Sequence, residues 1–453
     1  MQPVIMHLDM NSYFASVEQQ DNLAWRGKPV GVCEHLGGII IAASVEAKRW
    51  GIKTGTPVWE ARRLYPKIII TPTRPDRYRF YNRRMVEVVS DYTSAVEVYS
   101  IDEVFADLTK ACNVSKSADK LISLSAYQLM NPFEEAVSIA QEIKKRFKTE
   151  VGDWLRCSIG LAENKLLAKI GSDMKKPDGM VVVLPDSHQI LFERSREQEA
   201  RQNLVSPQGR KLNFAAYHKF DLYQKLSLTD IPGIGRRQEK NLNELGIKTL
   251  KELRDFPKSH LVSRFGPIMG HHLYNIGQLQ GTWKAPVCEE QEFKSMGHMY
   301  TLPQEYRRPE FFIPVLYKLC EMVGRRLRRR ELTGNIVSCY FHDKDYSGFG
   351  DSKKLGYFLQ DGREIFLECE RLIGKALTLA QGVKLVGVTV AGLRPYIHQL
   401  SLFGDVEQQR RTVKALDKIN DKYGEFTILR AQMLPAGKAF RDSIGFGRVK
   451  ELG

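Results

Sequence analysis

The order of extended and helical patterns in the first third of the chain limits its fold more than any other feature. An apolar run at Val4–Leu8 precedes a helical pattern at Tyr13–Gln20, and two extended runs within Val96–Leu108 precede a helical pattern at Pro132–Lys148. An extended segment at Cys157–Leu161 follows. Strand, helix, hairpin, helix and strand in this order are typical of a ferredoxin-like split βαβ core. We therefore expect the first strand and the hairpin to be neighbours.

Three carboxylates fall at the ends of these predicted strands. Asp102 and Glu103 are adjacent at the bend of the hairpin, and Asp9 ends the first apolar run. Like charges this close raise one another's pKa, so a chain that keeps them ionised usually holds a cation between them. The pattern predicts a divalent-metal site. The alternative is that Asp102 and Glu103 are ordinary turn residues, since Asp is common in turns.

Composition narrows the class of protein. A chain of 453 residues is expected to form two to four domains. It has no run of 18 apolar residues and no signal-peptide pattern at its start, so we expect a cytoplasmic protein without membrane association. The seven cysteines are scattered singly, which argues against a zinc ribbon or a disulfide scaffold and favours small buried residues. A net charge of +15 favours a polyanionic partner, although solvated basic faces are common.

The middle of the chain contains a candidate phosphate-binding turn. A polar stretch at residues 186–209 predicts a surface insertion or linker. After it, Gly233 and Gly235 stand before a helical pattern, which predicts a helix-hairpin-helix whose backbone N–H groups bind one phosphate. Arg236 and Arg237 favour this interpretation over an ordinary helix turn.

A separate α+β domain is predicted between Gln291 and Leu393. Its long helical pattern, Phe311–Arg330, ends in arginines that cover more than one side of the helix, which favours a phosphate-contacting surface over a solvated stripe. These arginines are Arg325, Arg326, Arg328, Arg329 and Arg330.

Several motifs together resemble the signature of the Y-family of translesion DNA polymerases, in its bacterial form. The motifs are His7–Glu18, Glu46–Lys53, Ser100–Glu103, Ser158–Lys169 and Asp173–Gly179. They occur in the family's order and spacing, and with the helix-hairpin-helix and the following domain the resemblance covers nearly the whole chain. Val45 and Lys48 stand where many members have tyrosine and arginine. This pattern is closer to the branch of the catalytic subunit of polymerase V than to polymerase IV, yet the chain ends differently from both, which leaves the subfamily open.

The resemblance implies an α+β multidomain fold. Residues 1–185 would form a ferredoxin-like palm with small fingers, 186–285 the insertion and a helical helix-hairpin-helix thumb, 286–395 an α+β little finger, and 396–453 a clamp-binding peptide and tail. The implied activity is template-directed DNA synthesis past lesions, distributive and of low fidelity. Its partners would be primer-template DNA, dNTPs and the bacterial sliding clamp. We expect a monomer that is nucleoid-associated when on DNA.

The resemblance also assigns roles to individual residues. Asp9, Asp102 and Glu103 would be catalytic and, with the Met10 carbonyl, would bind two Mg²⁺ ions, Asp102 being shared and Glu103 facing the primer. The triphosphate would bind Ser12, Tyr13, Phe14, Lys48 and Lys176. Phe14 would be the steric gate whose ring excludes a 2′-hydroxyl. DNA would contact Gly233, Gly235, Arg236, Arg325 and Arg329.

A short motif follows the last predicted domain. Gln399, Leu400, Leu402 and Phe403 resemble the bacterial clamp-binding pentapeptide, whose apolar side chains fill a pocket on the clamp. Two other functions stay open at this stage. One is a non-catalytic DNA-bound adaptor of the same fold, and the other is a nucleotidyl cyclase built on a similar palm. The intact carboxylates argue against the adaptor, and the predicted DNA-binding elements argue against the cyclase.

Overall fold

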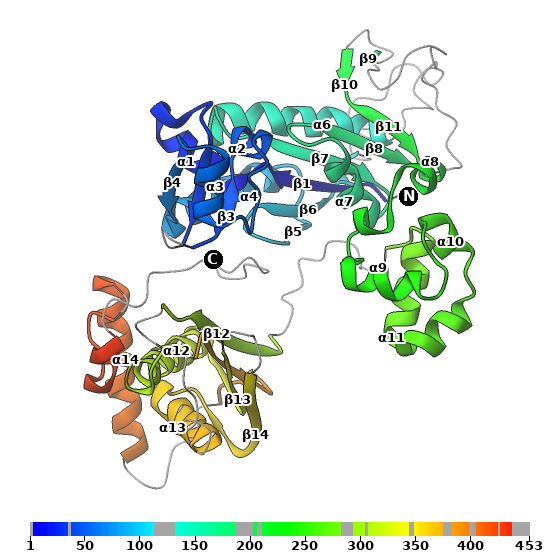
Figure 1. The fold of residues 1–453 in the computed structure, drawn as a ribbon. Helices are drawn as coiled ribbons and strands as arrows, with labels where there is room; N and C mark the ends of the chain where they lie inside the picture. The colour runs from blue at the N-terminus through cyan, green and yellow to red at the C-terminus, as the bar shows by residue number, and fades with distance from the viewer. Residues whose placement is uncertain are drawn as a thin grey trace, which may run out of the picture. The chain divides into compact units, whose positions relative to one another are not determined.

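The computed structural model describes residues 3–34, 38–112, 132–185, 203–205, 211–281, 293–303, 307–343, 348–374, 383–397, 405–424 and 426–436. They form two compact units: described residues up to 281 belong to the first, and those from 293 onward belong to the second (Figure 1). Each unit has a hydrophobic core of its own.

A six-stranded sheet forms the centre of the first unit, in the order β11-β8-β7-β1-β6-β5 (Figure 1). β1 (Ile5–Met10) pairs antiparallel with both β6 (Glu103–Asp107) and β7 (Cys157–Ala162), and β5 (Val96–Val98) completes the hairpin with β6. The order β7-β1-β6-β5 is that of a ferredoxin-like split βαβ core. The palm fold expected from the sequence is therefore confirmed.

Two further strands extend this core beyond β7. β8 (Met180–Leu184) runs parallel to β7, and β11 (Ala215–His218) runs parallel to β8. Within the polar stretch and just after it, β9 (Asn203–Val205) and β10 (Lys211–Asn213) pair as a separate two-stranded ribbon.

Helices on both faces of the sheet bury β1 along its whole length. Met6 and Leu8 pack with α1, α4 and α6, whereas Ile5 packs with α7 on the opposite face. Because side chains alternate along a strand, His7 and Asp9 share the face of Ile5. The bounds of the helical segments are α1 (Tyr13–Asp21), η1 (Leu23–Trp25), α4 (Pro75–Ser90), α6 (Pro132–Arg146), η2 (Phe147–Val151) and α7 (Lys165–Met174).

A small subdomain between α1 and α4 forms the fingers. Its three-stranded sheet has the order β3-β2-β4, and its core is a separate small cluster of apolar residues. Ser44 caps the first helix of the subdomain by accepting a hydrogen bond from the backbone N–H of Ala47. The elements are β2 (Val30–Cys33), β3 (Ile40–Ala43), α2 (Val45–Arg49), α3 (Val58–Leu64) and β4 (Ile69–Pro72).

The thumb is helical and follows β11. Glycines at positive φ shape its turns: among them Gly233, with φ 101°, precedes α9, and Gly266, with φ 80°, interrupts α11. Both values suit glycine because a Cβ would be strained there. The elements are α8 (Lys219–Lys225), η3 (Leu228–Asp230), α9 (Arg236–Asn243), α10 (Leu250–Asp255) and α11 (Lys258–Gly277).

The second unit is an α+β domain. Its sheet has the order β12-β15-β13-β14, a short strand β16 also pairs with β13, and α12 and α13 contribute to one core with the sheet. The elements are β12 (Ser295–Thr301), α12 (Pro309–Arg329), β13 (Leu332–His342), β14 (Gly348–Leu359), α13 (Gly362–Ile373), β15 (Leu385–Ala391) and β16 (Arg394–Pro395).

Two C-terminal segments also belong to the second unit. α14 (Asp405–Tyr423) follows β16, and η5 (Ala431–Ala436) packs Met433 into the core of the unit. No helix in the described part of the chain is long and apolar enough to span a membrane. The six cysteines within the described ranges are buried free thiols, as expected for small core residues.

Candidate active site

The three predicted metal-binding carboxylates meet at one end of the palm sheet. Asp9, near the end of β1, pairs in register with Glu103, the first residue of β6. The backbone N–H of Met10 donates to the carbonyl of Asp102 at 2.9 Å, which ties the bend to the end of β1. Directly paired residues project from the same face of a sheet. The antiparallel register thus sets two carboxylates opposite each other, with the third at the adjoining bend.

Two hydrogen bonds hold the bend in place. Ser100 Oγ donates to Asp102 Oδ1 at 2.6 Å, and Asn82 Nδ2 on α4 donates to the carbonyl of Ile101 at 2.6 Å. Asn82 is fully buried. Helix α4 therefore positions Asp102, although it is distant from the bend in sequence.

Burial and mutual repulsion raise the pKa of two of these carboxyl groups. Burial raises the pKa of Asp9 to about 7; Lys176 opposes this shift and Glu103 adds to it. Burial also raises the pKa of Asp102, with the hydrogen bond from Ser100 opposing and the charge of Asp9 adding. A cation bound among carboxylates relieves such repulsion. Because carboxylate oxygens are the donors that Mg²⁺ prefers, these residues fit a divalent cation.

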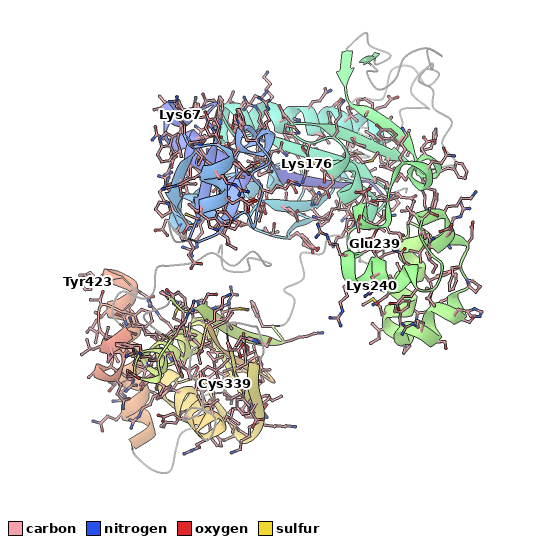
Figure 2. All side chains as sticks on the ribbon, viewed as in Figure 1. Lys67, Lys176, Glu239, Lys240, Cys339 and Tyr423 are labelled. Carbon is pink, nitrogen blue, oxygen red and sulfur yellow. The ribbon has the colours of Figure 1, made fainter. Side chains whose placement is uncertain are left out.

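Two lysines hold oxygen atoms of the same carboxylates. Lys176 Nζ lies 2.9 Å from Asp9 Oδ2 and 2.7 Å from Asp173 Oδ1, and Figure 2 shows Lys176 in the palm. Lys169 Nζ on α7 donates to Glu103 Oε1 at 2.7 Å. Among the residues that the structure describes, no three His, Cys, Asp or Glu side chains are arranged to hold a metal ion as they stand. The lysines act as internal counterions that a bound cation would displace.

Lys48, on α2 of the fingers, lies within electrostatic reach of the same site. Burial and the positive charge of Lys176 lower the pKa of Lys48, whereas the charge of Asp9 raises it. Two lysines that repel each other in this way favour an anion between them. A polyphosphate would satisfy both charges.

Helix α1 begins directly after β1 with an uncapped N-terminus. Its N-cap, Ser12, has the left-handed angles φ 49° and ψ 44° and makes no side-chain cap hydrogen bond. Asn11 stabilises the turn: its Nδ2 donates to Ser158 Oγ at 3.0 Å, and its Oδ1 accepts from the N–H of Asp178 at 2.7 Å. The first N–H groups of a helix lack intrahelical partners and form an anion site at the positive end of the helix dipole.

Phe14, the predicted steric gate, is fixed by an aromatic stack. Tyr13 and Phe14 are the first two residues of α1, and the Phe14 ring stacks on Tyr78 of α4, with centroids 4.3 Å apart and an interplanar angle of 15°. The hydroxyl of Tyr13 donates to the carbonyl of Tyr78 at 2.6 Å. The start of α1 is therefore attached to α4 through two neighbouring side chains.

Sequence reasoning missed Tyr78, Lys169 and His7. His7 is fully buried, with Nδ1 2.7 Å from Ser172 Oγ and Nε2 3.9 Å from Glu103 Oε2. Burial, followed by the charge of Lys169, keeps the pKa of His7 well below its usual range, so the ring is neutral. Lys169 lies in one of the recognised motifs, but nothing local in the sequence links it to Glu103.

The predicted helix-hairpin-helix turn lies between η3 and α9. Gly235 is the N-cap of α9 and has no side chain that could cap the helix. The first helical residue, Arg236, is exposed. The left-handed Gly233 turns the chain into this position. Uncapped N–H groups beside an exposed guanidinium can bind one phosphate group.

Arg325 and Arg329, both predicted to contact DNA, are paired with α14. Both guanidinium groups bind Asp421, and Arg325 is 7% exposed. Arg328 makes a bidentate pair with Asp417, at 2.7 and 2.8 Å. A DNA contact by Arg325 would therefore require its pair with Asp421 to break. The predicted clamp-binding residues Gln399, Leu400, Leu402 and Phe403 lie outside the described residues.

Comparison with known families covers both units. Residues 8–173 match the impB/mucB/samB family, and residues 293–402 match the C-terminal domain of that family. Residues 229–281 match the family described as the thumb domain of DNA polymerase-iota. The match to the first family includes Asp9, Asp102 and Glu103.

Curated relatives and a solved structure agree with this assignment. The chain is 33% identical over 441 residues to DNA polymerase IV of Pelotomaculum thermopropionicum, covering 96% of each chain. It is 34% identical over 440 residues to DNA polymerase IV of Moorella thermoacetica, covering 95% of this chain and 96% of that one. A solved Y-family DNA polymerase chimera shares the fold with a TM-score of 0.67 at 23% identity, covering 86% of this chain and 99% of that chain.

The relatives named here are polymerase IV proteins, so Val45 and Lys48 do not by themselves place the chain beside polymerase V. Family, relatives and fold agree over nearly the whole length. The chain belongs to the bacterial Y-family of DNA-directed translesion DNA polymerases.

Proposed function

We propose that the chain extends a primer on template DNA, using dNTPs, by two-metal nucleotidyl transfer of low fidelity. The observation that carries this proposal is the register that sets Asp9 opposite Glu103, beside Asp102 and the uncapped start of α1. In phosphoryl transfer, the protein mainly positions the reacting groups and neutralises the charge that develops on them. Acidic groups next to a helix N-terminus provide sites for cations and for phosphates side by side.

Asp9, Asp102 and Glu103, with the Met10 carbonyl, would hold two Mg²⁺ ions, Asp102 being shared and Glu103 facing the primer. When bound, such a pair activates the attacking hydroxyl and neutralises charge on the leaving group. The oxygen donors and the raised pKa values of Asp9 and Asp102 support this assignment.

The triphosphate would lie along the start of α1. Backbone N–H groups in the turn from Ser12 through Tyr13 to Phe14 would bind phosphate oxygens. Lys176 would leave Asp9 for the terminal phosphates, and Lys48 would approach from α2. The repulsion between Lys176 and Lys48, which a bound anion relieves, supports this arrangement.

Phe14 would be the steric gate, because an aromatic ring beneath the sugar collides with a 2′-hydroxyl. The small fingers support low fidelity and lesion tolerance. Gly38 and Ile39 would roof the new base pair, and Ile39 is 55% exposed. Because Gly38 has no side chain, a roof formed by Gly38 and Ile39 would leave space for a damaged base.

The other elements would hold the DNA. Gly233, Gly235 and Arg236 would bind the backbone from the thumb, and Arg325 and Arg329 from the second unit. We assign residues 1–185 to palm and fingers, 186–285 to the insertion and thumb, 286–395 to the little finger, and 396–453 to the clamp-binding peptide and tail. Distributive synthesis by a cytoplasmic monomer, recruited to the nucleoid by the sliding clamp, completes the proposal.

Primer extension tests the proposed chemistry. Wild-type protein with Mg²⁺, a primed template and dNTPs should extend the primer, whereas Asp102→Ala and Glu103→Ala should abolish extension and keep DNA binding. Asp76→Ala is the matched control, because the side chain of Asp76 is 95% exposed and pairs with Arg79 on α4. Failure of the wild type to extend any primer, or full activity of Asp102→Ala, would contradict the proposal.

A further inference from the structure

Tyr78 is held between two residues of α1 that lie one helical turn apart. Its ring stacks on Phe14, and its hydroxyl donates to Glu18 Oε1 at 2.7 Å. Residues four positions apart share one face of a helix, which is why α1 can hold both ends of a single tyrosine. Tyr78 is fully buried and Phe14 is 3% exposed.

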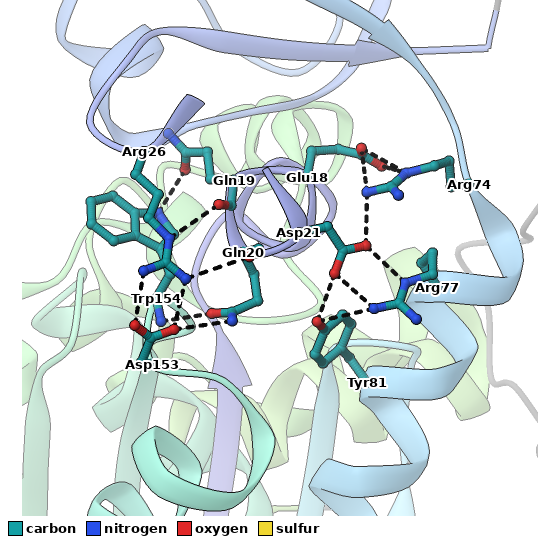
Figure 3. Close-up of polar contacts among 10 residues, drawn as sticks. All are labelled: Glu18, Gln19, Gln20, Asp21, Arg26, Arg74, Arg77, Tyr81, Asp153 and Trp154. Carbon is teal, nitrogen blue, oxygen red and sulfur yellow. Dashed lines mark hydrogen bonds and ion pairs between the residues drawn. The ribbon is translucent and has the colours of Figure 1, made fainter. Parts of the chain in front are cut away.

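The carboxylate of Glu18 is itself fixed by Arg74. Arg74 Nε donates to both oxygens, at 3.0 and 2.8 Å, and a second guanidinium nitrogen lies 2.7 Å from Oε2 (Figure 3). Glu18 is 1% exposed, and a carboxylate this deeply buried is stable only when it is paired and hydrogen-bonded. Arg74 immediately precedes α4, the helix that carries Tyr78. The contacts therefore link Arg74 to Glu18, Glu18 to Tyr78, and Tyr78 to Phe14.

In the hydrogen bond between Tyr78 and Glu18, the phenol is the donor. Burial raises the pKa of the Tyr78 phenol, and the Glu18 carboxylate raises it further. The phenol therefore stays protonated and always donates, so its hydroxyl has one preferred acceptor. A ring anchored at its hydroxyl cannot slide out from under the ring stacked on it.

We infer that Glu18, Arg74 and Tyr78 are positioning residues for sugar selection, because they fix the plane of the Phe14 ring from the side away from the nucleotide. This inference rests on the proposed role of Phe14 as steric gate. A gate that works by collision discriminates only while it does not move. If the supporting ring is free to shift, the Phe14 ring can tilt and admit the 2′-hydroxyl.

The same two helices offer a matched control. Tyr81, three residues after Tyr78 on α4, donates its hydroxyl to Asp21 Oδ1 at 2.7 Å, and Asp21 lies three residues after Glu18 on α1 (Figure 3). Asp21 also binds Arg77 and Arg74. Tyr78→Phe and Tyr81→Phe therefore each remove one phenol–carboxylate hydrogen bond between α1 and α4, but only Tyr78 stacks on Phe14.

The experiment compares the selectivity for a dNTP over the matching ribonucleotide, measured as the ratio of kcat/KM values in primer extension. Tyr78→Phe should lower this ratio about 3- to 10-fold, since only part of a charge-assisted hydrogen bond's energy reaches the gate. Glu18→Gln should lower it similarly. Tyr81→Phe should leave it within about twofold of wild type, because the Tyr81 hydroxyl contacts Asp21, the last residue of α1, and Arg77.

A double-mutant cycle separates positioning of the gate from general loosening. Phe14→Ala should itself admit ribonucleotides, and adding Tyr78→Phe to it should change selectivity no further, because Tyr78 acts through Phe14. Equal effects of Tyr78→Phe and Tyr81→Phe, or additive effects in the double variant, would overturn the inference. The ratio of dissociation constants for the two nucleotides on the enzyme–DNA complex gives the same comparison without turnover. Absence of dNTP extension by the wild type would instead count against the proposed function.

Discussion

Asp9 is 6% exposed and faces another carboxylate, an unfavourable position for a charge. We expect Asp9→Asn to abolish primer extension and yet to stabilise the metal-free protein by about 1–2 kcal/mol, because it removes a buried like charge. Lys176 keeps Asp173 as a partner in the variant. Thermal unfolding with and without Mg²⁺ checks this. Mg²⁺ should raise the wild-type melting temperature and leave that of Asp9→Asn unchanged.

The control for this prediction is Asp173→Asn. The Asp173 side chain is 40% exposed, so its removal should not stabilise the protein, and Mg²⁺ should still raise the melting temperature. A melting temperature for Asp9→Asn below that of the wild type would show that the contact with Lys176 outweighs the repulsion from Glu103.

At the scale of single residues, the sequence predicts the side chains that face ligands better than those that support them. The three carboxylates lie in recognisable motifs, and the structure brings them together as expected. Lys169 and Glu103 are 66 residues apart, and Tyr78 and Glu18 are 60 apart. Contacts over such distances depend on how helices pack on the sheet, which no local pattern encodes.

At the scale of elements, the start of α9 offers a sharp test of DNA binding. Gly235 has φ −87°, and a Cβ built there meets nothing within 4 Å, so a side chain fits. Aspartate is a good N-cap, so Gly235→Asp should leave stability unchanged or raise it by a few tenths of a kcal/mol. Its carboxylate would occupy the phosphate position, and DNA affinity should fall about tenfold.

Gly235→Ala provides the comparison, since it adds a side chain without charge or capping ability. Its DNA affinity, measured by fluorescence anisotropy at the same salt concentration, should stay close to wild type. Equal DNA binding by Gly235→Asp and the wild type would remove this turn from the proposed DNA interface.

Helix α14 decides whether Arg325 and Arg329 can reach DNA, since Asp421 binds both. Asp421→Asn should lower the free energy of unfolding by about 1–2 kcal/mol, because the buried Arg325 loses the charge of Asp421, whose own side chain is half exposed. DNA affinity at low salt should rise severalfold, because the negative charge that pairs with both guanidinium groups is removed.

Asp417→Asn is the control, because it breaks a comparable pair with Arg328 and leaves Arg325 and Arg329 bound. Urea unfolding and DNA titration measure both effects. Lower stability with unchanged DNA affinity would assign Arg325 and Arg329 to the packing of α14 instead of to DNA.

The prediction of elements from the sequence works best where apolar residues recur with a clear period. α6 lies close to the expected range, because its apolar residues form one clear buried face. β8 and β11 were not predicted: β8 is a short apolar run buried on both faces, which shows no alternation to identify a strand.

At the scale of the whole molecule, the proposed DNA contacts are spread over both units, whereas the carboxylates belong to one. The carboxylates, the gate and the thumb hairpin all belong to the first unit, whereas the paired arginines belong to the second. A net charge of +15 favours association with any DNA, so affinity should fall steeply with salt. Nonspecific charge cannot direct a polymerase to a primer end. A tether to a partner already on the primer can do so, by raising the effective concentration there.

The pentapeptide from Gln399 to Phe403 is our candidate for that tether. Deleting it, or changing Leu402 and Phe403 to Ala, should remove stimulation by a bacterial sliding clamp and shorten products in clamp-loaded reactions about tenfold or more. Extension without the clamp should stay at the wild-type rate, because the carboxylates lie in the other unit. Ser401→Ala is the control and should keep stimulation. Full stimulation of the deletion variant would place the clamp contact elsewhere, and equal loss with and without the clamp would show that the segment supports folding of the second unit.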